Sequence, residues 1–138
     1  HYQRGALAMN HTESQSQFVT GKAAMVFCGL WLDNEMKDVT PPGFEMRAFA
    51  MPAVENGKGN PRLVQASGWE FFLVPADARR PDAGFDFVRY MVSPDNAPSM
   101  GEQIGVISPI RGGTPKSAVS PALASAIDMI DGAAGFFS

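Results

Sequence analysis

The chain of 138 residues is long enough for one ordinary domain, and its hydrophobic share of 45% can build a core. Charged residues make up only 18% of the chain, and its formal net charge is -3. A mildly acidic chain without a basic stripe is a poor match for nucleic acid or an anionic membrane, so we expect neither as a partner.

Cysteine usage excludes a disulfide framework, because Cys28 is the only cysteine. No spacing of His, Cys, Asp and Glu fits a metal site, so we expect no metal and no cofactor. A membrane-spanning run of about 18 apolar residues is also absent from the sequence. The chain starts without Met or a signal-like segment and ends near two exposed-looking phenylalanines. We therefore expect a piece of a longer chain.

The first predicted element is a helix over residues 12–20, with Thr12 as its N-cap and Gly21 as its stop. The short apolar run 22–28 ends at Gly29 and predicts a strand that is buried on both faces. A helix and a strand in this order begin an α/β pattern.

The middle of the chain predicts a short helix over 32–37 and a strand over 44–51, where apolar residues alternate. A loop over 55–61 separates them from two short strands at 63–66 and 70–74.

The last third is mainly helical. A proline in the first turn and an apolar face predict a helix over 81–92, and a second helix starts at Ser93. An extended segment over 106–110 and a helix over 120–130 follow. The order of helices and strands indicates the α/β class.

Both tryptophans, Trp31 and Trp69, lie close to a glycine at the end or start of a predicted strand. Strand ends in open α/β sheets border ligand crevices, and an indole face can stack on the apolar face of a sugar ring. Glu35 and Glu70 are near enough in sequence to hydrogen-bond sugar hydroxyls. The alternative is that both indoles fill the core. Four further aromatic residues are expected in the core: Phe71, Phe72, Phe85 and Phe87.

Signatures of catalysis are weak, and we expect no catalytic residue. The two histidines, His1 and His11, lie in the weakly patterned start, and no Cys/His pair is apparent. Asp33 and Glu35 are two residues apart on a predicted helix, so their carboxylates would not face each other. Neither a nucleophile elbow nor a phosphate-binding glycine loop is present.

The stretch 18–25, FVTGKAAM, followed by GLW at 29–31, resembles the F-x-x-G-K-A-A-M…G-x-W pattern of extracellular solute-binding proteins of carbohydrate ABC importers. The proteins with this pattern form family 1 of the extracellular solute-binding proteins, the maltose-binding-like group. Further matching segments follow in order up to about residue 125: MP, GW, VPAD, SPDNA and GVISPI. The stretch GLWLDNEMKDVTPPGFEM is most similar to actinobacterial binders of N-acetylglucosamine or chitobiose.

The resemblance implies a two-lobed periplasmic-binding-protein type II fold, of which this chain would be a C-terminal-half fragment. Residues of about 1–48 and 112–138 would be segments of the C-terminal lobe. Residues of about 65–108 would belong to the N-terminal lobe, with hinge crossings between the lobes.

The resemblance also assigns roles to single residues. Trp31 matches the indole that stacks on sugar, and Trp69 matches a cleft position near the hinge. Glu35 and Glu70 have suitable chemistry but no motif match. Cys28 replaces an Asn that is common before the glycine.

The implied function is non-catalytic binding of a mono- or oligosaccharide and its delivery to the membrane subunits of an ABC importer. The implied location is extracytoplasmic: the protein would be a cell-surface lipoprotein or would lie in the periplasm. Two alternatives stay open. One is a glycan-processing enzyme fragment that uses Asp33 or Glu35 with Glu70. The other is a self-associating structural module without a ligand of its own.

Overall fold

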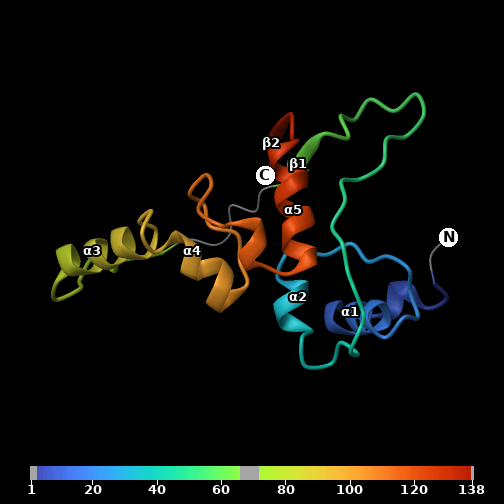
Figure 1. Ribbon diagram of the computed structural model, residues 1–138, viewed down its shortest axis with the longest axis horizontal. Coiled ribbons are helices and arrows are strands. Elements are labelled where there is room, and N and C mark those ends of the chain that lie inside the picture. The colour runs from blue at the N-terminus through green and yellow to red at the C-terminus, as the bar shows by residue number, and fades with distance from the viewer. Residues whose placement is uncertain (1–2, 66–71, 138) are drawn as a thin grey trace.

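The computed structural model describes residues 3–65 and 72–137. Helices dominate it, and α1, α2, α5 and the two strands lie together, whereas α3 lies at one end of the long axis (Figure 1). The helices are α1 (His11–Val19), α2 (Leu32–Glu35), α3 (Pro81–Met91), α4 (Ala97–Ser99) and α5 (Pro121–Asp131). Short 3-10 turns cover Ala6–Ala8 and Lys116–Ala118, and a π-helical turn covers Met100–Ile104. Strand β1 (Leu63–Gln65) pairs in parallel with β2 (Gly135–Phe137).

Side-chain caps start the two helices that matter most for the core. The Asn10 side chain accepts a hydrogen bond from the Glu13 backbone N–H at 2.8 Å, and the Glu13 carboxylate accepts one from the Asn10 N–H. This reciprocal capping box replaces the predicted Thr12 cap. Ser120 caps α5 by accepting from the Leu123 N–H at 3.2 Å, as its sequence predicts.

The predicted strands at 22–28 and 44–51 are wrong, because neither segment has regular structure. A strand needs a neighbour for its backbone groups, and β1 and β2 pair only with each other in the described part of the chain. The segment 22–28 is also not buried on both faces. Val26 and Cys28 pack against the core, whereas Phe27 is 79% exposed. The predicted strand at 63–66 is confirmed by β1.

The main core joins segments that are distant in sequence. It is formed by α1, α2, the segment around residue 45 and the start of α5. Phe18 of α1 meets Phe44 edge to face, with ring centroids 5.4 Å apart. The buried members of this cluster are Val19, Leu32, Met36 and Met46. This core fixes α2 against α1, and the candidate site lies at their junction.

Outside this core the chain exposes unusually much surface. Its accessible area is 10634 Å², whereas a compact protein of its mass exposes about 7000 Å². Helix α3 is confirmed over the predicted span, yet none of its residues is buried. The expectation that Phe72, Phe85 and Phe87 lie in the core is therefore wrong. Phe71 lies outside the described residues.

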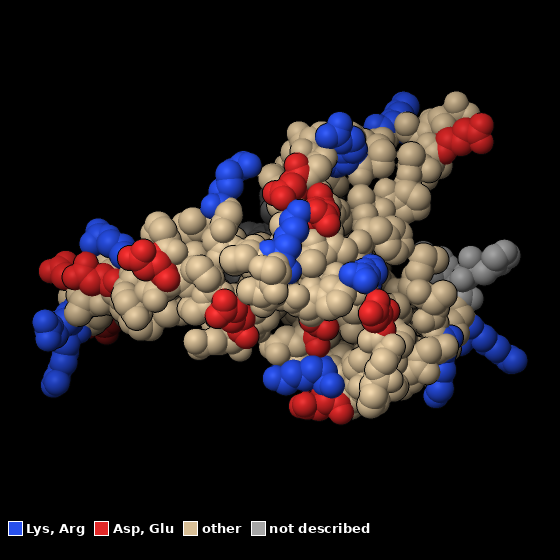
Figure 2. Space-filling model, viewed as in Figure 1, with Lys and Arg blue, Asp and Glu red and all other residues tan. Residues whose placement is uncertain are grey.

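Charges are mixed on the molecular surface. Acidic and basic side chains alternate on the face in view in Figure 2. Lys116 pairs with Asp128 and Asp131, which ties the turn before α5 to that helix. The hydrogen bond that Lys116 donates to the Asp128 carboxylate raises the pKa of the exposed Lys116.

Candidate functional site

Trp31 lies at the N-terminal end of α2, and its side chain is 45% exposed. The indole is therefore not core filler. Its Nε1–H donates to Nε2 of His11 on α1 at 3.4 Å, and the two ring centroids are 6.2 Å apart. A large apolar face that is both exposed and held at its polar edge has the properties of a ligand platform.

Gly29 makes room for this indole. A Cβ atom built on Gly29 would lie 2.0 Å from Cζ3 and 2.3 Å from Cη2 of Trp31, far inside van der Waals contact. The ring thus lies directly against the glycine backbone. The G-x-W spacing is explained by this contact, because any side chain at position 29 would occupy the position of the ring.

A hydrogen-bond network connects Trp31 to Glu35 through two residues of α1. The amide Nε2 of Gln15 donates to Oε2 of Glu35 at 2.7 Å and lies 3.1 Å from Nε2 of His11. Gln15 is fully buried, whereas His11 and Glu35 are exposed. The network therefore extends from a buried amide to a carboxylate and an indole at the surface.

Glu35 and Trp31 are thus connected through Gln15 and His11 in one hydrogen-bond network. Trp69 and Glu70 lie outside the described residues, so their roles remain predictions.

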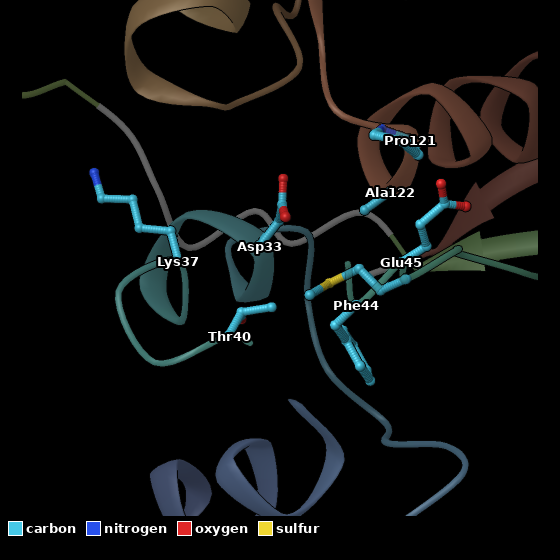
Figure 3. A pocket seen from close by; sticks show the side chains of 8 residues that line it. Asp33, Lys37, Thr40, Phe44, Glu45, Pro121 and Ala122 are labelled. Atoms are coloured by element: carbon cyan, nitrogen blue, oxygen red, sulfur yellow. The ribbon is translucent and has the colours of Figure 1, made fainter. Parts of the chain in front are cut away.

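Asp33 faces a different environment from Glu35. It lines a cavity of about 230 Å³ between α2, the segment after it and the start of α5 (Figure 3). The labelled lining residues are Asp33, Lys37, Thr40, Phe44, Glu45, Pro121 and Ala122. Because the Glu35 carboxylate instead binds Gln15, the two acids of α2 do not form a facing pair.

Sequence reasoning missed three members of the site: His11, Gln15 and Cys28. No Cys/His pair is visible in the sequence, yet the fold places Cys28 Sγ 3.8 Å from His11 Nε2 and 3.5 Å from Gln15 Nε2. His11 and Gln15 are four residues apart and share a face of α1, but the predicted helix over 12–20 starts one residue after His11. Their approach to Trp31 depends on the chain folding back.

Within residues 3–65 and 72–137, no group of three or more His, Cys, Asp or Glu side chains could hold a metal ion. None of the described helices has the length and apolar character needed to cross a membrane.

A family model described as bacterial extracellular solute-binding protein matches residues 2–128. The chain therefore belongs to this family, and the resemblance seen in its motifs is confirmed. Members of this family are binding proteins that take up solutes outside the cytoplasm, and this is the class of protein to which the chain belongs.

A particular relative supports the same class. The diacetylchitobiose binding protein NgcE of Streptomyces coelicolor (strain ATCC BAA-471 / A3(2) / M145) is 27% identical over 114 residues. The alignment covers 81% of this chain and 24% of that protein, so the chain spans about a quarter of the relative's length. No solved structure matches the chain.

Proposed function

We propose that the protein binds an N-acetylglucosamine-containing oligosaccharide, with diacetylchitobiose as the first ligand to test, and that Trp31 is a stacking platform for a sugar ring. Glu35 supplies a carboxylate to sugar hydroxyls beside the indole. Binding is non-catalytic, and the protein delivers its ligand to the membrane subunits of an ABC importer from an extracytoplasmic position.

One observation carries the proposal. The Trp31 indole is held against Gly29 and hydrogen-bonded at its edge while nearly half of its surface is open to solvent. Aromatic faces combined with a few polar groups are typical of small-ligand sites. The ligand for which the Streptomyces relative is named suggests which sugar to test.

The proposal includes a two-lobed arrangement. Residues of about 1–48 and 112–138 form one lobe, and residues of about 65–108 contribute to the other. The first grouping is supported by contacts between its two parts: the Ala48 N–H donates to Oγ of Ser125 at 2.7 Å. The partly buried Ala122 also packs against the main core.

The second lobe is proposed to approach the site at α2. A Cβ atom built on Gly105 would lie 3.4 Å from Cβ of Asn34, so the loop after residue 104 borders the helix that carries Glu35. Trp69 and Glu70 are proposed to complete the sugar contacts from this side. A ligand that touches both lobes would favour the closed state by its differential affinity.

The test is isothermal titration calorimetry on the complete gene product that carries this sequence. Diacetylchitobiose, N-acetylglucosamine and maltose are titrated into the wild type and Trp31→Ala. We expect diacetylchitobiose to bind and Trp31→Ala to weaken its affinity about tenfold or more, because a stacked aromatic face is lost.

Tyr90→Ala on α3 is the control, since it removes another exposed aromatic ring. An unchanged affinity in Trp31→Ala would contradict the platform role. Diacetylchitobiose recovered intact after incubation with the protein would fit the non-catalytic role, whereas its cleavage would support the enzyme alternative.

A further inference from the structure

We propose that His11 is a positioning residue, which holds the Trp31 indole in its binding orientation only while the imidazole is neutral. Sugar binding then weakens on acidification through His11. This inference rests on the proposed function, because it concerns the regulation of the same platform.

The chemistry of the network fixes the role of each nitrogen. The Glu35 carboxylate is an acceptor, so the Gln15 group that lies 2.7 Å from it is the amide nitrogen, as placed. This nitrogen also faces Nε2 of His11 at 3.1 Å and Sγ of Cys28 at 3.5 Å, and an amide nitrogen can only donate. Its second hydrogen points to the nearer of the two, so Nε2 of His11 is the acceptor.

The indole leads to the same conclusion independently. Trp31 Nε1 has a hydrogen to donate and nothing to accept with, and it faces the same His11 nitrogen at 3.4 Å. Two donors thus converge on one acceptor. A ring nitrogen that accepts both bonds requires a neutral imidazole whose proton is on Nδ1.

The indole is restrained from two directions. Gly29 leaves space for its face, and His11 binds its nitrogen edge. Because Gln15 is fully buried and tied to α2 through Glu35, His11 is itself held in place. A ring that is already oriented loses less conformational freedom when ligand binds, which favours affinity.

Protonation would break this arrangement. An imidazolium has N–H groups at both nitrogens, so Gln15 and Trp31 would each face a donor instead of an acceptor. The other titratable groups of the network are the Cys28 thiol at 3.8 Å and, beyond Gln15, the Glu35 carboxylate. The Glu35 carboxylate bonds to Gln15 and not to His11. Histidine is the side chain whose charge ordinarily changes between pH 5 and 8.

The experiment compares His11→Gln and His11→Leu with the wild type in the complete gene product. Diacetylchitobiose affinity is measured by calorimetry at pH 7.5 and pH 5.5. Gln offers an acceptor that does not titrate, and Leu offers none. His1→Gln is the control, because it removes the other histidine of the chain.

We expect the wild type and His1→Gln to bind about fivefold more weakly at pH 5.5 than at pH 7.5, the order of one net hydrogen bond. His11→Gln should bind similarly at both pH values, and His11→Leu should bind weakly at both. A wild-type pH profile in His11→Gln, or wild-type affinity in His11→Leu, would overturn the positioning role.

A second readout does not depend on sugar. The indole N–H resonance of Trp31, assigned by its loss in Trp31→Phe, is followed by NMR between pH 5.5 and 7.5. We expect a pH-dependent shift that disappears in His11→Gln. If the wild type binds no sugar, the proposed function fails while this resonance still tests His11. If sugar binds but the pH-dependent shift of the Trp31 resonance is the same in His11→Gln as in the wild type, only the positioning inference fails.

Discussion

The absence of a side chain at Gly29 allows the Trp31 indole to lie where it does and to expose one of its faces. The indole occupies the space where a Cβ at position 29 would be, so its exposed orientation depends on glycine. His11 then adds a directional contact at the indole nitrogen. The space left by the missing side chain at position 29 and one hydrogen bond to His11 together determine where this ring lies.

Gly29→Ala should therefore displace the indole and reduce diacetylchitobiose affinity by about as much as Trp31→Ala, roughly tenfold. Calorimetry measures this change. Gly59→Ala is a matched control, because a Cβ atom built on Gly59 meets nothing within 4 Å. Wild-type affinity in Gly29→Ala would mean that the ring does not need its present position.

At the scale of elements, the helices follow from local signals and the strands do not. The segments 81–92 and 120–130 carry proline and capping residues that act within a few positions, and both form helices. The segment 22–28 carries the composition of a strand but lacks a partner among the described residues. Strand β2 was not predicted, because its pairing with β1 joins Leu63 to Gly135.

The residues of the candidate site also differ in how visible they are in the sequence. Trp31 and Glu35 could be named as candidates because aromatic and acidic residues beside a glycine turn are visible in the sequence itself. His11 and Gln15 could not, since their contacts with Trp31 and Glu35 cross 20 positions of the chain. Such contacts exist only after α1 and α2 pack around their common core.

The caps offer a test that separates element stability from site geometry. Asn10→Ala removes the cap that immediately precedes His11, and Ser120→Ala removes the cap of α5. Each should lower the free energy of unfolding by about 1 kcal/mol in urea denaturation. Only Asn10→Ala should also weaken sugar binding, because α1 carries the network. Equal affinity in both variants would argue against a role for α1 in the site.

At the scale of the whole molecule, the main feature is incomplete burial. The chain exposes 10634 Å², well above the roughly 7000 Å² typical of its mass. The aromatic residues of α3 account for part of this surface, with Phe85, Phe87 and Tyr90 all exposed. Large apolar surfaces of this kind are usually covered by other protein.

The 138 residues expressed alone should therefore bind the dye ANS and self-associate. Size-exclusion chromatography with light scattering measures the association. Replacing Phe85, Phe87 and Tyr90 together by Ser should reduce both effects while the helical circular dichroism is kept. A monodisperse monomer with sharp cooperative unfolding and no ANS binding would contradict the inference that this surface needs cover.

Stacking of a sugar ring on Trp31 is tested most directly by NMR. The indole N–H resonance of Trp31, identified by its absence in Trp31→Phe, is recorded in the complete gene product before and after saturation with diacetylchitobiose. We expect saturation to shift this resonance clearly. Saturable sugar binding that leaves the Trp31 resonance unmoved would show that the sugar does not stack on this indole.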